Sequence, residues 1–447
     1  MGRVWGLLLV ACASTAQPPA PENPAVPAAP LMLLRGGTLM TAAGPTLEGA
    51  DLLIRGSRIE ALGIGLAAPS GARVIDLEGR FVTPGLIDPH SHLGVYPSPR
   101  TRAHADGNEA TDPFTPEVRA EESFWPQDPG LRRAVAGGVT SLHVLPGSAN
   151  LVGGQGFTLK LRPALSAAGM RLDGAPATMK LACGENPKRV YGQGRKRAPA
   201  TRMGEIALLR SKLEKARAWA ADPDHQLADE DSDQATGKEA RDFGLAALAG
   251  TLEGRVLIQN HCYRADEMLL RLSLFGEFDT QPRAFHHAVE AYKIREQLAA
   301  ADVGAVVWVD WWGSKLEMLD SVPANAALLD AAGVRVALHS DSAYDVQHLN
   351  QEAAKAMAAG RRAGLEVEPE DAIRWVTAHP AWILGIDDRT GTLEAGKDAD
   401  VVVWSGTPFS VYAHADLVFI DGRLVYDRAR PGSYRVSDFE LGTRSAP

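Results

Sequence analysis

Apolar and polar positions follow two different patterns along the chain. Residues 33–85 form short apolar runs broken by Gly, Pro and Asp, and the alternation in 51–62 (DLLIRGSRIEAL) predicts strands joined by tight turns. The segments 391–406 (GTLEAGKDADVVVWSG) and 417–427 (LVFIDGRLVYD) have the same character. These segments predict one small β domain that is assembled from both chain ends.

The middle of the chain, about residues 86–388, alternates strand-like apolar runs with helical patterns. Residues 203–221 and 288–301 have helical periodicity. Alternating strands and helices over this length favour a (β/α)8 TIM barrel, which is an α/β fold. A doubly wound open sheet is the runner-up, but no glycine-rich phosphate loop follows the first strand. The strand candidates are residues 86–92, 138–145, 178–185, 255–261, 305–310 and 334–341.

Composition and charge narrow the class of protein. A chain of 447 residues, 45% of them hydrophobic, is long enough for one large domain and a smaller one. The net charge of −9 argues against nucleic acid as a partner. With only Cys12, Cys183 and Cys262, the chain does not resemble a disulfide framework, although the last two could pair or stay free. None of these features indicates an oligomeric state.

The N-terminus indicates export. One cation, a short apolar run and small residues are typical of a secretory signal, and the run is about a third of what a membrane-spanning helix needs. LVAC, ending at Cys12, resembles the bacterial lipobox, in which the Cys is acylated after cleavage. We expect a signal peptide over 1–12, a Pro/Ala-rich tether over 13–30, and a lipid anchor as the only membrane contact. The protein would then lie on the periplasmic side of the envelope. The alternative is an uncleaved start with a chance Cys.

Several predicted strands end in side chains that can bind metals. His90 and His92 are two residues apart on the first strand, so their imidazoles project from the same face. Active sites of (β/α)8 enzymes lie at the C-terminal ends of the strands, so we expect the strand-end residues to meet. The later strand ends contribute Glu185, His261, His286, His287 and Asp341.

This set of side chains predicts a metal site. Zinc readily takes neutral imidazole and carboxylate ligands, so we expect one or two divalent metal ions, with zinc as the expected metal. A bound divalent ion lowers the pKa of water and polarises a substrate carbonyl. A neighbouring carboxylate can take the proton of that water and pass it to a leaving amine. Asp341, at the end of the last strand, suits this catalytic role.

Six segments spread along the chain carry a shared signature. They are TPGLIDPHSH (83–92), GVTSLHVLPGSANLVGGQG (138–156), GENPKRVYG (184–192), HHAVEAYKI (286–294), HSDS (339–342) and HPAWILGIDDRTGTLEAGKDADVVVW (379–404). Together they resemble the amidohydrolase superfamily, in its imidazolonepropionase-like and prolidase-like branch. The resemblance implies a metal-dependent hydrolase barrel over 85–388. It also implies a composite β-sandwich built from residues 31–84 and 389–433.

The resemblance also implies individual roles. His90 and His92 match the ligands of the family's first strand, and Asp341 matches its last-strand aspartate. His261 and His287 match the histidines of strands five and six. We choose His287 over His286 because the family pattern His-x-x-Glu-Ala-Tyr begins at His287, which leaves His286 as a neighbour of the site.

The bridging ligand after the fourth strand stays open between two residues. Many relatives use a carboxylated Lys to bridge two metals, and others use Glu. Lys180 and Glu185 are five residues apart, which on an ideal strand puts them on opposite faces, so one of them serves. We favour Glu185, because it lies at the strand end and needs no added carbon dioxide, and keep Lys180 as the alternative. With neither residue bridging, the site holds one metal.

Four further residues are candidates for substrate binding. Arg189 and Tyr191 follow the presumed bridge and could clamp a substrate carboxylate, or could order their own loop. Asn150 and Gln155 could donate to a carbonyl, or could fix a turn. The long insert 96–129 resembles the same branch and is expected to form a lid. Cys262 is expected to be buried packing.

We therefore expect a metal-dependent hydrolase that cleaves a carbon–nitrogen bond. The substrate would be a small molecule with an amide or peptide bond, such as a dipeptide or an N-acyl amino acid. One alternative is a deaminase or cyclic-amide hydrolase of a heterocycle. An alternative from another class is a non-catalytic envelope binding protein.

Overall fold

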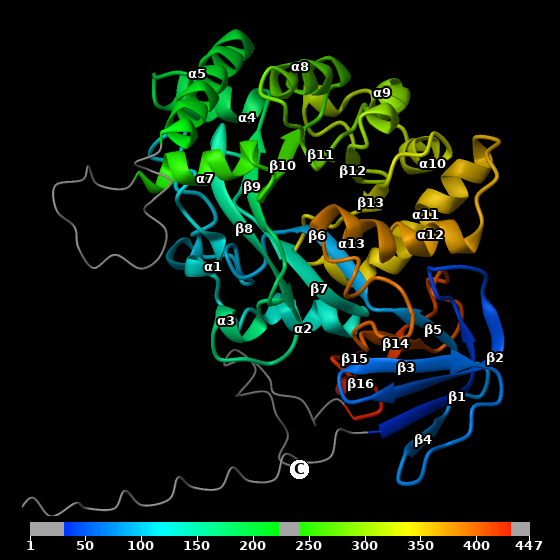
Figure 1. The fold of residues 1–447 in the computed structure, drawn as a ribbon. Helices are drawn as coiled ribbons and strands as arrows, with labels where there is room; N and C mark the ends of the chain where they lie inside the picture. Colours follow the sequence, from blue (N-terminus) through cyan, green and yellow to red (C-terminus); the bar gives the residue numbers. More distant parts are fainter. Residues whose placement is uncertain (1–30, 223–241, 431–447) are drawn as a thin grey trace, which may run out of the picture.

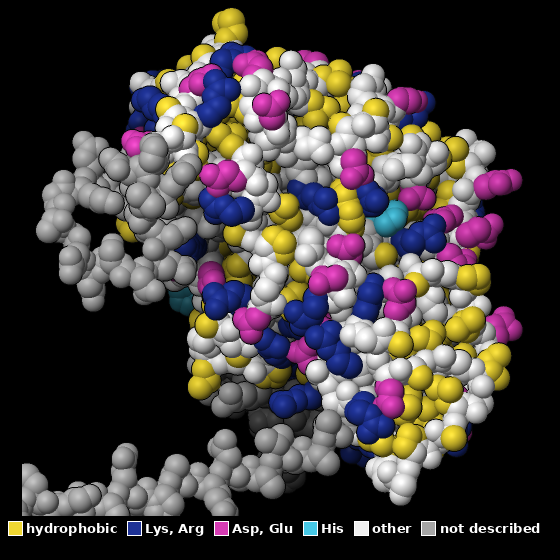
Figure 2. Space-filling view, in the orientation of Figure 1, with side chains coloured by type: hydrophobic (Ala, Val, Ile, Leu, Met, Phe, Trp, Pro, Cys, Tyr) yellow, Lys and Arg dark blue, Asp and Glu magenta, His cyan; other side chains and the backbone are white. Residues whose placement is uncertain are grey.

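The computed structural model describes residues 31–222 and 242–430 (Figure 1). The expected signal segment, Cys12 and the tether lie outside these residues, so their roles stay predictions. No helix within the described part of the chain is both long enough and apolar enough to cross a bilayer. On the face drawn in Figure 2, Lys and Arg side chains are interspersed with Asp and Glu.

One sheet contains strands from both chain ends and lies at the lower right of Figure 1. Its order is β16-β15-β14-β5-β1-β2-β3, with β4 paired to β1. β5 joins the two halves, because it pairs parallel with β1 and antiparallel with β14. The bounds are β1 Leu31–Leu39, β2 Leu47–Arg55, β3 Arg58–Gly63, β4 Arg73–Asp76, β5 Phe81–Pro84, β14 Val401–Trp404, β15 Ala415–Ile420 and β16 Arg423–Asp427.

The second sheet is a nearly closed barrel whose strands follow chain order, with its first and last strands in contact. Seven of the eight strands share one direction, and β8 runs antiparallel to β7 and β9. The bounds are β6 Leu86–Ser91, β7 Val139–Val144, β8 Val152–Lys160, β9 Ala177–Ala182, β10 Val256–Cys262, β11 Ala284–His287, β12 Gly304–Val307 and β13 Val336–Leu338.

β8 corrects the expectation of eight parallel strands. Residues 145–151 connect it to β7, and a link that short permits a hairpin but not the crossover of a dozen or more residues that a parallel strand needs. The sequence analysis placed no strand here, because Gly153, Gly154 and Gly156 interrupt the apolar pattern. In β8 a Cβ at Gly154 would lie 2.6 Å from the Val118 carbonyl oxygen, so these glycines let the insert pass close to the strand.

Helices cover the outside of the barrel (Figure 1). α5 matches the expected helix, and the Thr201 side chain accepts a hydrogen bond from the Gly204 amide at its start. The expected helix over 288–301 is divided into a 3-10 turn, Ala291–Ile294, and α9. The longer helices are α2 Pro129–Ala136, α5 Arg202–Ala221, α7 Phe243–Leu252, α8 Ala265–Gly276, α9 Arg295–Ala300, α10 Asn325–Ala331, α11 Leu349–Arg362, α12 Pro369–Arg374 and α13 Ala378–Leu384. The short ones are α1 Ala120–Ser123, α3 Ala167–Met170 and α4 Glu185–Pro187.

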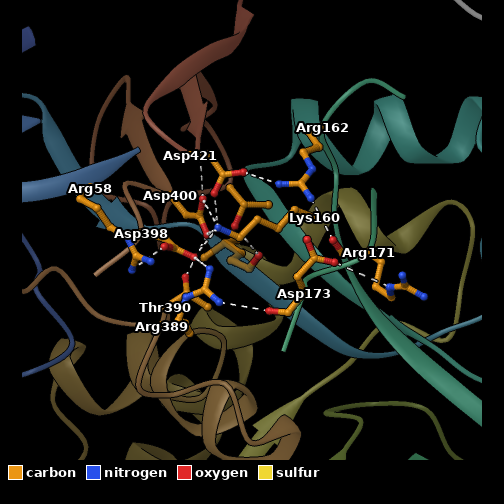
Figure 3. A network of polar contacts seen from close by, with 12 residues as sticks. Arg58, Lys160, Arg162, Arg171, Asp173, Arg389, Thr390, Asp398, Asp400 and Asp421 are labelled. Atoms are coloured by element: carbon orange, nitrogen blue, oxygen red, sulfur yellow. Dashed lines mark hydrogen bonds and ion pairs between the residues drawn. The ribbon is translucent and has the colours of Figure 1, made fainter. Parts of the chain in front are cut away.

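A buried ionic network joins the barrel to the sheet from the chain ends (Figure 3). Lys160, the fully buried last residue of β8, lies 2.7 Å from Asp398 and 3.1 Å from Asp400, and it also pairs with Asp421. Burial lowers the pKa of Lys160, but the three carboxylates outweigh this effect and raise it above its usual value. Because β8 is antiparallel, this network lies at the barrel end opposite the strand ends that were expected to bind metal.

Candidate metal centre

The predicted strand-end residues meet at one end of the barrel. His90 comes from β6 and His92 directly follows it, His261 comes from β10, His287 from β11, and Asp341 follows β13. The His90 ring centroid is 5.1 Å from that of His92 and 4.6 Å from that of His287, which is 4.4 Å from that of His261. Asp341 Oδ1 is 3.4 Å from His92 Nε2. These side chains are close enough to share one or two ions.

His339 is a member of this cluster that sequence reasoning missed. Its ring centroid lies 5.1 Å from that of His90 and 5.0 Å from that of His287, and the three could hold one ion together. His90, His92 and Asp341 form a second such group. The signal was present in HSDS, because His339 lies two residues before Asp341, at the spacing that marked the pair on β6.

Lys180, and not Glu185, reaches the cluster. Its Nζ lies 3.5 Å from His90 Nε2, on the inward face of β9. β9 ends at Ala182, and Gly184 with a φ of 83° turns the chain before Glu185. Glu185 instead lies 3.7 Å from Lys315 Nζ and is one-third exposed. The preference for Glu185 is therefore corrected, because the turn after the strand carries its carboxylate away from the imidazoles.

A hydrogen-bond chain fixes the tautomer of His90. Gln259 Nε2 donates to the Ile383 carbonyl at 3.2 Å, so its Oε1 faces His286 Nε2 at 2.6 Å and accepts a proton from it. A neutral His286 then accepts at Nδ1 from His90 Nδ1, 2.9 Å away. The lone pair of His90 is left on Nε2, which faces the cluster. His286 is thus a neighbour of the site, as expected.

Other contacts orient the remaining groups. His92 Nδ1 donates to the Leu145 carbonyl at 2.8 Å, which leaves its Nε2 free to bind a cation. Asp88 is fully buried. It accepts one hydrogen bond from the His90 amide at 3.1 Å and another from Ser340 Oγ at 2.5 Å. Through Asp88 the first barrel strand is tied to the segment that carries Asp341.

Two members of the cluster have strained backbones. His287 has a φ of 68° and Asp341 a φ of 49°, in the left-handed region that non-glycine residues rarely adopt. Each such residue costs of order 1–3 kcal/mol and persists where the surrounding structure enforces it. Strain at two residues of one cluster is characteristic of a functional site.

The residues present fit a divalent cation. Nδ1 of His287 and both ring nitrogens of His339 are buried without a hydrogen-bond partner. Burial lowers the pKa of His90, His261 and His287 well below the usual value, so these imidazoles are neutral and can act as ligands. Burial also lowers the pKa of Lys180, which makes the neutral amine needed for carboxylation more accessible.

The cluster opens into a pocket of about 580 Å³. Its wall includes His92, His261, His287 and Asp341, so a bound molecule would contact the cluster directly. The other residues that line it include Tyr96, Arg100, Asn108, Ser148, Asn186, Arg189, Tyr263, Lys315 and Tyr344.

One of the four substrate-binding candidates, Arg189, lines this pocket. The structure gives the other three a different role, which is to hold the insert 96–129. Asn150 Nδ2 donates to the Glu109 and Asp112 carbonyls, and Gln155 Nε2 to the Pro116 carbonyl. The hydroxyl of Tyr191, a fully buried residue, donates to the Asp112 carbonyl at 2.7 Å. Sequence patterns could not show this, because the polar partners lie far away along the chain.

Cys183 and Cys262 form a disulfide, which the sequence had left open. Cys262 is therefore not simple apolar packing. The bond joins the ends of β9 and β10, directly beyond the strand positions of Lys180 and His261. It connects the two strands that carry Lys180 and His261 to the cluster.

Comparisons with known proteins agree with this geometry. A model of the amidohydrolase family matches residues 288–426. The crystal structure of an amidohydrolase from Thermotoga maritima is 36% identical, covers 89% of this chain over 100% of its own length, and superimposes with a TM-score of 0.81. The chain belongs to the amidohydrolase family. This membership confirms the expected class of enzyme, one that acts on carbon–nitrogen bonds.

Two curated proteins are similar to parts of this amidohydrolase. The amidohydrolase tasK of Hapsidospora irregularis is 36% identical over 377 residues, which are 80% of this chain and 38% of that protein. The dihydroorotase of Geobacter sulfurreducens is 35% identical over 115 residues, 26% of this chain and 22% of that protein. The chain thus spans well under half of the length of either relative.

Proposed function

We propose that this amidohydrolase is a metal-dependent hydrolase that cleaves an amide or peptide bond of a small molecule with water. The observation that carries the proposal is the convergence of His90, His92, His261, His287 and Asp341 on one pocket. Substrates of the expected class are dipeptides and N-acyl amino acids.

Different side chains of the protein would bind the metal and transfer the proton. His90, His92, His261, His287, Lys180 and Asp341 would hold one or two divalent ions, zinc being the proposed metal, and His339 adds a further imidazole. When bound, such an ion lowers the pKa of water and polarises the substrate carbonyl. Lys180 would bridge as its carbamate.

Asp341 would move the proton. Its carboxylate lines the pocket and is about one-fifth exposed, so it can reach both water and substrate. Burial raises the pKa of Asp341 above its usual value, which makes it a better base. It would accept a proton from the attacking water and donate that proton to the leaving amine.

A second candidate function is hydrolysis of a cyclic amide. The local similarity to a dihydroorotase favours this candidate. The volume of the pocket, about 580 Å³, is also compatible with a small ring. Both candidates use the same metal and the same proton carrier. They differ only in whether the amide lies in a ring.

The test combines metal analysis with turnover. Protein purified in zinc or manganese should hold at least one equivalent of metal and hydrolyse members of a panel of dipeptides, N-acyl amino acids and cyclic amides. Lys180→Ala should lose bound metal and about 100-fold or more in kcat, whereas Glu185→Ala should keep both. Activity confined to cyclic amides would replace the first candidate with the second. Less than one equivalent of metal with no turnover would favour the non-catalytic envelope binding protein.

The envelope location is also a proposal. It is supported by the disulfide between Cys183 and Cys262, because such bonds persist mainly in oxidising compartments. Incorporation of labelled palmitate in a bacterial host, abolished by Cys12→Ala, is the expected result. Recovery of the wild-type chain in the cytosol without lipid would contradict it.

A further inference from the structure

We propose that Lys315 and Arg189 form an anion subsite that binds a carboxylate of the substrate next to the bond that is cleaved. The inference rests on the proposed function and narrows it. The substrate would be an N-acyl amino acid or a peptide whose C-terminal residue is released, and not a neutral heterocycle.

Lys315 lies on the pocket wall close to the imidazoles. It belongs to the loop after β12, and its Nζ is 4.3 Å from the centroid of the Tyr263 ring. That ring is stacked on His287, with centroids 5.3 Å apart. The same Nζ lies 3.4 Å from Asn186 Oδ1. The cation is therefore separated from a cluster imidazole by a single aromatic ring.

The pocket carries an excess of positive charge. Arg100, Arg189 and Lys315 line it from three separate segments, with Arg189 in the π-helical turn Lys188–Gly194. Asp341 is the only carboxylate among the described residues that line it. Among the described residues, no carboxylate forms an ion pair with Arg100 or Arg189. Asp341 is needed at the cluster, so the three cations have no neutralising group of their own inside the pocket.

The surroundings of Lys315 fit a missing anion. Burial lowers the pKa of Lys315, the charges of Glu185 and Glu317 oppose this effect, and the charge of Arg189 lowers the pKa further. Glu185 is 3.7 Å away and one-third exposed, so it compensates only in part. A carboxylate between Lys315 and Arg189 would remove this repulsion and accept charge-assisted hydrogen bonds from both.

The rest of the pocket fits the same class of substrate. Tyr96, Tyr263 and Tyr344 provide aromatic surface for the apolar part of a released amino acid. Asn186 lies between the cluster and Lys315, with its Nδ2 3.5 Å from His261 Nε2 and its Oδ1 3.4 Å from Lys315 Nζ. Asn186 and Ser148, which also lines the pocket, can bind the amide. A carboxylate held at one end and an amide at the other would place the scissile bond over the cluster.

Calorimetric titration with two matched probes tests the subsite without requiring turnover. The probes are 3-phenylpropanoate and 3-phenylpropan-1-ol, titrated into the metal-loaded full chain. The wild type should bind the carboxylate at least about tenfold more tightly than the alcohol. Lys315→Met and Arg189→Met should each weaken the carboxylate by about 10- to 100-fold and leave the alcohol unchanged, and Lys315→Arg should restore most of the loss.

The matched control is Lys293→Met, which removes a cation that pairs with Asp320 outside the pocket and should change neither affinity. Equal carboxylate affinity in the wild type, Lys315→Met and Arg189→Met would overturn the subsite, because the anion would then bind elsewhere. Binding of neither probe would overturn it as well. If the subsite binds as expected but no amide in the panel is hydrolysed, the proposed function fails while the subsite stands.

Discussion

At the scale of single residues, the orientation of His90 depends on side chains that never enter the pocket. The Ile383 carbonyl fixes the orientation of the Gln259 amide, which in turn sets the tautomer of His286. His286 then sets the tautomer of the His90 ring. Partners of this kind orient a ligand imidazole and typically change metal affinity 10- to 100-fold. Gln259 is thus a positioning residue.

We expect Gln259→Leu to weaken metal binding by about 10- to 100-fold, because His286 loses its acceptor and His90 its fixed tautomer. Competition with a chelator measures the affinity, and 15N chemical shifts of the imidazoles report the tautomer. Gln259→Glu, which still accepts from His286, should retain most of the affinity.

Gln297→Leu, on the exposed side of α9, serves as the control for a Gln-to-Leu change. Wild-type affinity with an unchanged imidazole spectrum in Gln259→Leu would show that packing alone orients His90.

At the scale of elements, Lys160 connects β8 to the loops around β14 and β15. Its buried ammonium group holds Asp398, Asp400 and Asp421 together (Figure 3). Removing one partner of a buried ion pair leaves charge uncompensated, which typically costs 3–5 kcal/mol.

We expect Lys160→Met to lower the free energy of unfolding by about 3–5 kcal/mol, and the melting temperature with it. Thermal unfolding followed by circular dichroism provides the measurement. Lys355→Met removes a surface cation, 42% exposed, that pairs with Asp310 and Glu352, and should cost less than about 1 kcal/mol. Equal melting temperatures for the two variants would contradict the stabilising role of the network.

At the scale of the whole molecule, the barrel buries an unusual number of neutral imidazoles. Burial lowers the pKa of His143 and of His92 to about 3, whereas an unfolded chain titrates near its ordinary value of 6.5. The unfolded state therefore binds more protons at acidic pH. The stability linked to these groups is fully present above about pH 6.5 and is lost as the pH falls below it.

We expect metal-depleted protein to lose stability steadily between about pH 6.5 and pH 4. His143 bonds to Thr158 Oγ1 at 3.3 Å, to Thr178 Oγ1 at 3.1 Å and to the backbone of Phe157, so changing it leaves the hydrogen bonds of the cluster in place. His143→Asn should make the slope of unfolding free energy against pH shallower by up to about 1.4 kcal/mol per unit. Denaturant titrations at several pH values measure that slope, and an unchanged slope would exclude His143 as a contributor.

The sequence by itself determined much of the architecture, because alternation and strand-end chemistry are local properties. It gave the barrel strands from β6 to β13 except β8, the α5 helix, and the convergence of His90, His92, His261, His287 and Asp341. These residues share one feature, since each lies at or just after the end of a buried parallel strand, and the strands of one barrel bring their ends to one face.

Only the tertiary structure decided the remaining points. Lys180, and not Glu185, reaches the cluster because of the turn at Gly184, and His339 joins it because the barrel places its ring beside those of His90 and His287. Tyr191, Asn150 and Gln155 hold the insert because their partners come from distant parts of the chain. Which side chains meet at one point depends on the turn that follows each strand and on the hydrogen-bond partners that distant segments provide. The periodicity of a single segment contains neither kind of information.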